Sequence, residues 1–374
     1  MSAKLFVSNI RRSVKSIKSL RYIVPNVLNS IKNKSYSHLI FVSDGVNWVL
    51  DWEVKEIKSI AEGLGFSTKI TQPSGLFKQS IFYSNKYFLR KPENFLKRKN
   101  HIAFPYFHGY PSSGEASAVL CYENLKKFHH YISRIQISHT YMRDIILETG
   151  IDPQKVFLIP IGINPDFFQI QTPESKKEAR EKYGVSQEAI VVGSFQKDGE
   201  GWGEGLTPKL IKGPDVFVEA VSILKSSVPE LFVLLSGPAR GYVKRGLERL
   251  NIPYKHIYLQ DYPEVGQLFQ CLDLYIVAAR EEGGPKAILE SMASGIPLVT
   301  TRVGQAMDLV KHGENGMMVD VNDAEGLASG AMDFLSDSEM RKKVIKSGFE
   351  TVKENTYLSQ TPLWEQFFKG FVVF

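Results

Sequence analysis

The stretch that decides the fold runs from Cys271 to Asp320: CLDLYIVAAREEGGPKAILESMASGIPLVTTRVGQAMDLVKHGENGMMVD. Its first apolar run, Leu274–Ala278, is rich in β-formers and predicts a buried strand. Two acids and two glycines follow. Pro285 then suits the first turn of a helix, because the amide proton that it lacks would be unpaired there. Apolar residues at helical spacing come next, Gly295 ends the helix, and Ile296–Thr300 predicts a second strand.

The loop between the predicted strand and helix has the features of an anion-binding site. Gly283 and Gly284 let the backbone approach a ligand closely, and the start of a helix offers NH groups and a positive dipole end. Glu282 lies in the loop, and Glu290 lies on the helix about a turn and a half after Pro285. We expect one carboxylate to reach beyond the phosphates of a nucleotide and the other to reach back to a ribose. The alternative is an ordinary strand–loop–helix with surface acids.

Three separated pieces of this stretch resemble the donor-binding motif of glycosyltransferase family 4. They are the spacing Glu282–x7–Glu290, the run SMASGIPLVTT, and GENG at Gly313–Gly316. The resemblance implies an α/β protein of the GT-B fold, with two Rossmann-like domains whose parallel sheets face each other across a cleft. It also implies a retaining transferase that needs no metal and no cofactor, because a nucleoside diphosphate sugar is a co-substrate whose charge is met by lysine and helix NH groups.

Length and composition agree with a two-domain globular protein. A chain of 374 residues suits two domains, and strands alternate with helices as in α/β folds. We expect an acceptor-side domain over 1–170, a nucleotide-sugar-binding domain over 171–355, and a helix over 356–374 that crosses back to the first domain. The two cysteines favour a reducing compartment, and no apolar run reaches the length of a membrane span. The expected location is cytoplasmic, or peripheral on the inner face of a membrane.

The net charge of +6 is unevenly distributed between the two halves. Residues 1–170 hold 23 Lys and Arg against 12 Asp and Glu, whereas residues 171–374 hold 23 against 28. A basic first half favours an anionic membrane surface over nucleic acid, for which no motif is present. Residues 1–24 form a basic amphipathic pattern that suits either a membrane-touching helix or plain packing, and a transit peptide has a similar composition. The basic and aromatic segment 77–100 predicts a lip for a sugar or lipid-linked acceptor.

The resemblance assigns further site residues along the chain. Lys212, beside Gly213 at a helix start, would neutralise phosphate. The family's usual arginine before it is absent, and Gln196 or Lys197 stands in its place within a glycine-rich insert. His108, which follows the predicted strand 101–107, would contact the donor sugar. Asp261 would lie where the base binds through backbone atoms. The expected donor site is completed by the loop and the helix start, that is, by Gly283, Gly284, Pro285, Lys286 and Glu290.

One further arginine leaves two outcomes open. Arg240 follows the strand 231–236 and could reach a phosphate or form a surface pair.

The predicted activity is transfer of a hexose from a nucleotide sugar to the hydroxyl of a glycan, glycolipid or other acceptor, with assembly of a cell-surface glycan as the expected setting. His108, Lys212 and Glu282 are the predicted catalytic residues. A sugar-nucleotide epimerase of the same architecture would act without an acceptor. A phosphorylase would need phosphate, and in its best-known branch a cofactor-bound lysine. A non-catalytic nucleotide-binding protein would bind without turnover, and the missing arginine is the one feature in its favour.

Overall fold

The computed structural model describes residues 23, 27, 38–43, 49–96, 99–113 and 115–372. The chain divides into two compact units. Unit 1 comprises 1–137, 143–159 and 361–374, and unit 2 comprises 138–142 and 160–360. The domain ranges expected from the sequence stay predictions beside this division. In the described part of the chain, no helix is both long and apolar enough to cross a membrane.

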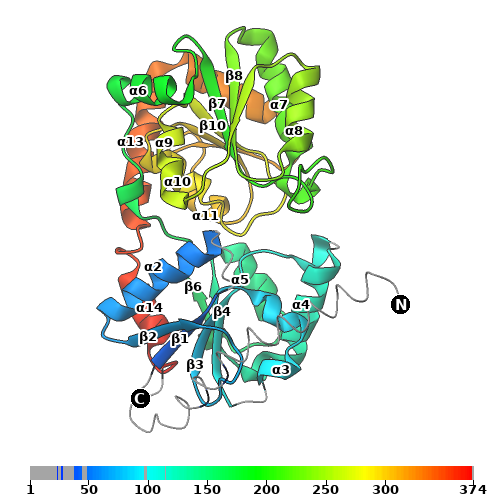
Figure 1. Ribbon diagram of the computed structural model, residues 1–374, viewed down its shortest axis with the longest axis vertical. Coiled ribbons are helices and arrows are strands. Elements are labelled where there is room, and N and C mark those ends of the chain that lie inside the picture. The colour runs from blue at the N-terminus through cyan, green and yellow to red at the C-terminus, as the bar shows by residue number, and fades with distance from the viewer. Residues whose placement is uncertain are drawn as a thin grey trace. The chain divides into compact units, whose positions relative to one another are not determined.

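Unit 1 is built around a six-stranded parallel sheet with the strand order β2-β1-β3-β4-β5-β6 (Figure 1). Its strands are β1 (His38–Val42), β2 (Ser67–Thr71), β3 (Ser80–Tyr83), β4 (His101–Pro105), β5 (Ile132–Ile137) and β6 (Val156–Leu158). Its helices are α2 (Val49–Gly63), α3 (Glu93–Leu96), α4 (Ala116–Phe128), α5 (Thr140–Leu147, whose first residues are counted with unit 2) and α14 (Thr361–Phe368).

The last helix, α14, is part of the core of unit 1. Trp364, Phe367 and Phe368 are each at most 1% exposed. The ring of Phe82 on β3 meets Trp364 and Phe367 edge to face, with centroid distances of 6.0 and 5.9 Å. Edge-to-face pairs of this kind stabilise a packed core beyond the area that they bury. The end of the chain therefore belongs to the same folding unit as its first strands.

Unit 2 also has a six-stranded parallel sheet, in the order β12-β11-β10-β7-β8-β9. Its strands are β7 (Ile190–Phe195), β8 (Leu231–Ser236), β9 (Tyr254–Ile257), β10 (Leu274–Val277), β11 (Leu298–Thr301) and β12 (Met317–Val319). Its helices are α6 (Pro173–Tyr183), α7 (Pro214–Ser227), α8 (Gly241–Arg249), α9 (Val265–Phe269), α10 (Ala287–Ala293), α11 (Ala306–Leu309), α12 (Ala324–Ser336) and α13 (Ser338–Glu354).

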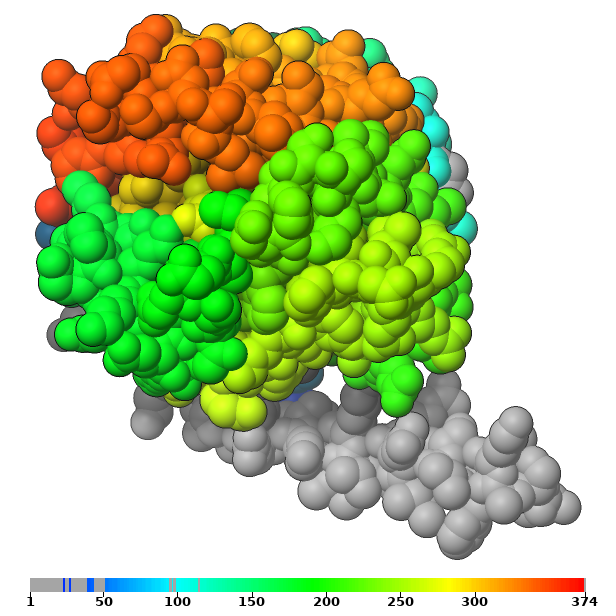
Figure 2. All heavy atoms as spheres, turned by 90° about the horizontal axis from the view of Figure 1, so that it is seen from above, coloured from blue at the N-terminus to red at the C-terminus, as the bar shows by residue number. Residues whose placement is uncertain are grey.

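The sheet of unit 2 is buried on both faces, as parallel sheets are. Successive side chains of a strand point to opposite faces, so Val191 of β7 lies in one apolar cluster and Val192 lies in the other. Figure 1 shows α7 and α8 on one side of the sheet and α9 and α10 on the other. Helix α12 packs against α7, and Figure 2 shows the orange α12 and α13 beside the lime and yellow-green segment that contains α7 and α8.

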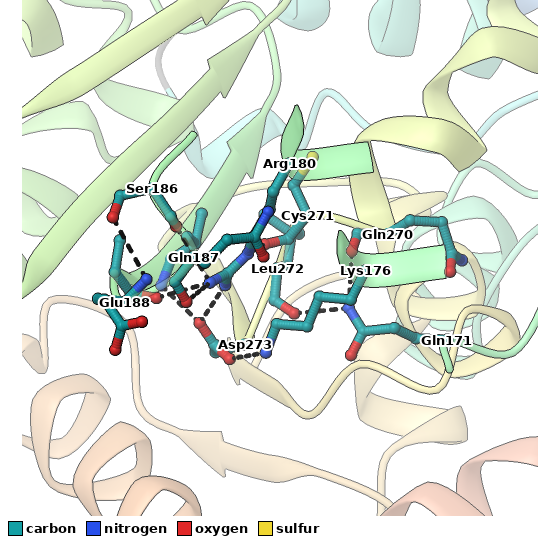
Figure 3. A network of polar contacts seen from close by, with 12 residues as sticks. Gln171, Lys176, Arg180, Ser186, Gln187, Glu188, Gln270, Cys271, Leu272 and Asp273 are labelled. Atoms are coloured by element: carbon teal, nitrogen blue, oxygen red, sulfur yellow. Dashed lines mark hydrogen bonds and ion pairs between the residues drawn. The ribbon is translucent and has the colours of Figure 1, made fainter. Parts of the chain in front are cut away.

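A buried arginine fixes α6 to the amino ends of β7 and β10, the two central strands of the sheet of unit 2 (Figure 3). The guanidinium of Arg180 on α6 donates to the carbonyls of Cys271 and Ala189 at 3.0 Å and to Asp273 at 2.7 Å. Asp273 also accepts from the backbone NH of Val191 at 2.7 Å and from the ammonium of Lys176. The buried charge is thus both paired and hydrogen-bonded, which is the condition for burying it.

The two parallel sheets confirm the predicted α/β architecture. The sequence predicts strands over 38–43, 66–70, 101–107, 134–138, 156–159, 189–194, 231–236, 256–259, 274–278 and 296–300, and each observed counterpart begins and ends within two residues of its prediction. Two strands were not predicted, β3 and β12. The acceptor lip expected over 77–100 is wrong for residues 80–83, because all four residues of β3 are buried. The amphipathic pattern predicted over 1–24 lies outside the described residues, apart from Ile23.

Candidate functional site

The turn that carries Lys212 is fixed by a glycine. Gly213 has a φ of +61°, and a Cβ atom there would lie 1.8 Å from the carbonyl oxygen of Ala278, just beyond β10. Only glycine tolerates both the left-handed conformation and the close approach. The carbonyl of Ile211 in the same turn accepts from the backbone NH groups of Arg280 and Glu281, both at 2.9 Å. The turn 210–213 is therefore tied to the loop that follows β10.

This tie brings together two of the predicted residues. The ammonium of Lys212 lies 2.6 Å from Oε1 of Glu282, and both side chains are largely shielded, with 22% and 14% of their surface exposed. The pair stands at the carboxyl end of a parallel sheet, where ligands of open α/β sheets bind. A cation and a carboxylate held side by side here can contact, respectively, a phosphate and a sugar hydroxyl.

The glycine loop next to Glu282 is held in a defined shape. The carbonyl of Gly283 accepts from Oγ of Ser138 at 2.6 Å and from the backbone NH of Gln305 at 3.1 Å. A Cβ atom on Gly284 would lie 2.6 Å from Ile161 and 2.8 Å from the side-chain oxygen of Gln305. The second glycine is therefore needed for close packing against protein atoms on one side of the loop.

Glu290 is 5% exposed and lies on α10. Its Oε1 accepts a hydrogen bond from the hydroxyl of Tyr262 at 2.6 Å. Burial raises the pKa of Tyr275 on β10, and the negative charges of Glu290 and Glu282 raise it further. The hydroxyl of Tyr275 accepts from the backbone NH of Phe195 at 2.7 Å. Both predicted carboxylates thus act electrostatically on one buried phenol behind the site.

Lys286, at the N-cap of α10, turns its side chain toward two tyrosines. Its Nζ donates to the hydroxyl of Tyr357 at 2.8 Å and lies 5.0 Å from the ring centre of Tyr262 and 5.4 Å from that of Tyr357. Such a placement over aromatic faces favours the cation. Pro285 does not begin the helix, because α10 starts at Ala287, and the carbonyl of Pro285 accepts from the NH of Ile288 at 3.1 Å.

The insert between β7 and α7 brings further lysines near Lys212. Burial lowers the pKa of Lys197, and the charges of Lys209 and Lys212 lower it further. The backbone NH of Lys209 donates to the carbonyl of Asp198 at 2.8 Å, and the Lys197 ammonium lies 4.9 Å from the ring centre of Trp202. Lys197 therefore lies near two other cations, Lys209 and Lys212, and its role in place of the missing arginine stays a prediction.

The two outcomes expected for Arg240 are both wrong. Its side chain is 1% exposed and pairs with the equally buried Asp198 at 3.0 Å. It also donates to the carbonyl of Ser236 at 2.7 Å and to Oγ of Ser194 at 3.0 Å. Both terminal nitrogens of the guanidinium are bonded to protein atoms, whereas the buried Nε has no hydrogen-bond partner among the described residues. Burial raises the pKa of Asp198, whereas the charge of Arg240 lowers it.

The two remaining predicted residues are Asp261 and His108. Asp261 is exposed at the start of a short 3-10 turn, 262–264, and precedes the Tyr262 that binds Glu290. His108 belongs to unit 1 and follows β4, where it is half-buried. Its carbonyl accepts a hydrogen bond from the ammonium of Lys86, a side chain that is itself buried against the ring of Tyr106. The loop position of His108 is therefore fixed within its own unit.

Metal-binding side chains do not gather in the part of the chain that the structure describes. No group of three or more His, Cys, Asp or Glu residues there is arranged to hold an ion.

The fold and this site define a class of protein. The structure matches Anabaena HepE, solved in complex with UDP-glucose, with a TM-score of 0.71, 15% identity, and coverage of 89% of this chain and 99% of that one. Sucrose-phosphate synthase from Thermosynechococcus elongatus matches with a TM-score of 0.71, 14% identity, and coverage of 89% and 100%. At such identities the likeness shows the fold alone, which is GT-B.

The family follows from the sequence of unit 2. Residues 206–351 match the model of "Glycosyl transferases group 1". The chain is 26% identical over 192 residues to N-acetyl-alpha-D-glucosaminyl L-malate synthase of Bacillus anthracis, covering 50% of this chain and 46% of that protein. It is 24% identical over 204 residues to the lipopolysaccharide core biosynthesis mannosyltransferase LpsB of Rhizobium meliloti, covering 52% and 55%. The segment 206–351 matches this family, which confirms the resemblance to glycosyltransferase family 4. It spans about half the length of the curated relatives it matches.

The sequence did not indicate three of the residue pairs that shape the site. Tyr262 donates to Glu290, and Ser138 donates to the carbonyl of Gly283. Arg280 donates two hydrogen bonds to Asp215, both 2.7 Å long. Each joins residues far apart along the chain, so no local spacing could have found them.

Proposed function

We propose that this protein transfers a sugar from a nucleoside diphosphate sugar to an acceptor hydroxyl, with retention at the anomeric carbon. The observation that carries the proposal is the ion pair of Lys212 and Glu282 at the carboxyl end of β10, with Glu290 on the helix that follows. The family membership of the segment 206–351 supports it, since that segment contains all three residues.

In this mechanism Lys212 moves from Glu282 to the donor diphosphate. It stabilises the negative charge that grows on the diphosphate as the bond to the anomeric carbon breaks, which is electrostatic catalysis. Lys197, in the insert between β7 and α7, stabilises the same negative charge on the diphosphate. Glu282, released from Lys212, accepts hydrogen bonds from hydroxyls of the donor sugar, and Glu290 holds the ribose. The backbone of Gly283, Gly284 and the helix start lies against the diphosphate.

The bond changes balance without a protein nucleophile. The oxygen of the acceptor forms a bond to the anomeric carbon on the face that the diphosphate leaves, and the acceptor proton passes to an oxygen of the leaving phosphate. His108 contributes a contact to the donor sugar, and Asp261 lies near the base. The positive charge near the diphosphate comes from lysine, so the proposed reaction does not call for a divalent cation.

The neighbours suggest where to look for donor and acceptor. HepE was solved with UDP-glucose, and LpsB is named for lipopolysaccharide core biosynthesis. We therefore rank UDP-hexoses first among donors and cell-surface glycans or glycolipids first among acceptors. Contact with an anionic membrane surface stays a prediction of the basic first half, whose amphipathic segment 1–24 lies outside the described residues apart from Ile23.

The test is a panel of nucleotide sugars scored by thermal shift and by slow hydrolysis of the donor. It needs no knowledge of the acceptor. The proposal expects one donor to raise Tm and to be hydrolysed, and Lys212→Ala to abolish both effects. A panel that leaves Tm unchanged would overturn it. Conversion of the donor sugar to its epimer without an acceptor would favour the epimerase instead.

A further inference from the structure

Tyr262 and Glu290 come from separate elements and meet in a short hydrogen bond. The phenol of Tyr262 lies in the 3-10 turn 262–264, and Glu290 lies on α10. The hydroxyl donates to Oε1 of Glu290 at 2.6 Å, and the carboxylate is 5% exposed. A bond from hydroxyl to carboxylate of this length is charge-assisted and stronger than a bond between neutral groups.

The ring of Tyr262 is itself held on several sides. Phe167 and Phe168 meet it edge to face with centroid distances of 6.4 and 6.3 Å. The ammonium of Lys286 lies 5.0 Å from its ring centre and is anchored by its hydrogen bond to Tyr357. The hydroxyl therefore has a fixed position, and through it the plane of the Glu290 carboxylate is fixed as well.

A carboxylate accepts about four hydrogen bonds, and the bond from Tyr262 takes one of these positions. A sugar diol offers two hydroxyls in a rigid relationship, and it is bound well only by acceptors that are already oriented. We propose that Tyr262 is a positioning residue that orients Glu290 toward the ribose hydroxyls, and that it thereby sets the preference for ribonucleotide over 2′-deoxyribonucleotide donors. This inference rests on the proposed function, in which Glu290 holds the ribose.

The test compares affinities for a nucleoside diphosphate and for its 2′-deoxy form, measured by calorimetry on the full chain. Both nucleotides carry the base of the donor that gives the largest thermal shift in the panel of nucleotide sugars. Tyr262→Phe removes the hydroxyl and keeps the ring against Phe167, Phe168 and Lys286. We expect the ribo form to bind roughly tenfold or more tightly than the deoxy form in the wild type, as loss of a charged hydrogen bond implies. In Tyr262→Phe the ratio should fall to about threefold or less, because the ribo form loses two oriented hydroxyl contacts and the deoxy form, which keeps only the 3′ hydroxyl, loses one.

A matched control is available in the same unit. Tyr254 donates to Oε1 of Glu248 at 2.6 Å, the same bond at the same length, on β9 and α8. Tyr254→Phe should leave the ribose preference at the wild-type value. A general loss of packing would weaken both nucleotides equally and would not change their ratio, so the ratio separates positioning from a structural role.

Glu290→Gln distinguishes the failure of this inference from the failure of the proposed function. If Glu290→Gln keeps the wild-type preference, Glu290 does not hold the ribose and the proposed role falls with the inference. If Glu290→Gln loses the preference while Tyr262→Phe keeps it, the inference alone is overturned. The double variant should match Glu290→Gln, and a further loss would also overturn it. Tyr262→Trp, another ring without the hydroxyl, serves if Tyr262→Phe is not recovered folded.

Discussion

Lys212 and Glu282 form an ion pair in which Nζ and Oε1 lie 2.6 Å apart. The pair stands where the turn 210–213 meets the loop after β10, and neither residue is buried deeply enough to be locked there. A ligand that offers a phosphate to the lysine and hydroxyls to the carboxylate can replace each partner. We predict that the two charged groups exchange partners when a donor binds.

Lys212→Ala should cut turnover by roughly a hundredfold or more, because it removes a charge that stabilises the leaving diphosphate. Stability should change by about 1 kcal/mol or less, since a partly exposed ion pair contributes little. Steady-state kinetics and thermal unfolding check both halves of this prediction. Lys342→Ala, which removes an exposed pair with Glu339, is the control and should leave turnover as it is. Turnover of Lys212→Ala within threefold of the wild type would contradict the electrostatic role.

Glu282→Gln should separate nucleotide binding from transfer. The substitution removes the carboxylate that pairs with Lys212, so the lysine no longer has to leave an ion partner to meet a phosphate. We expect the nucleoside diphosphate to bind equally well or severalfold more tightly at low salt, while turnover falls by roughly tenfold or more. Calorimetric titration and initial rates measure the two effects. Weaker binding of the diphosphate would show that the two residues do not exchange partners.

Gly213→Ala should destabilise the fold. The φ of +61° is unfavourable for alanine, and the added Cβ would lie 1.8 Å from the carbonyl oxygen of Ala278. We expect a loss of about 2 kcal/mol or more in the free energy of unfolding, measured by urea titration. Gly203→Ala is the matched control, because a Cβ there meets no atom within 4 Å and its φ is not positive. It should change stability by about 0.5 kcal/mol or less.

Stability should fall as the pH is lowered from about 6.5, partly because of His256. Burial lowers the pKa of His256, and the charges of Arg240 and Lys244 lower it further, while a hydrogen bond to the carbonyl of Gly237 opposes them. Below the unfolded-state pKa the unfolded chain takes up a proton that the folded protein does not, so protonation favours unfolding.

His256→Gln removes this titration. Between pH 7.5 and about 5.5, the free energy of unfolding should therefore fall less steeply in the variant than in the wild type. The two slopes should differ by at most about 1.4 kcal/mol per pH unit, the value for one proton. Urea titrations of both proteins at the two pH values give the comparison. His312→Gln is a control on another loop of the same unit. An equal slope in wild type and His256→Gln would rule out this source of acid sensitivity.

Local pattern was enough to predict the parallel architecture and the donor loop. Apolar runs such as Leu274–Ala278 and Leu231–Ser236 are long enough to read as strands, and the glycines after them mark loops. The strand β3 escaped because it is embedded in a basic and aromatic segment, and β12 escaped because it directly follows the glycine motif 313–316, which favours a loop.

The sequence by itself determined the alternation of strands and helices and the resemblance to a family. It also determined which residues to examine: Lys212, Glu282 and Glu290. Only the tertiary structure decided which side chains pair. Lys212 pairs with Glu282, Tyr262 bonds to Glu290, and Arg240 pairs with the buried Asp198 rather than with a phosphate. The reason is physical. Backbone conformation depends on near neighbours in the chain, whereas the partner of a charged side chain depends on which distant segments the packed sheet brings beside it.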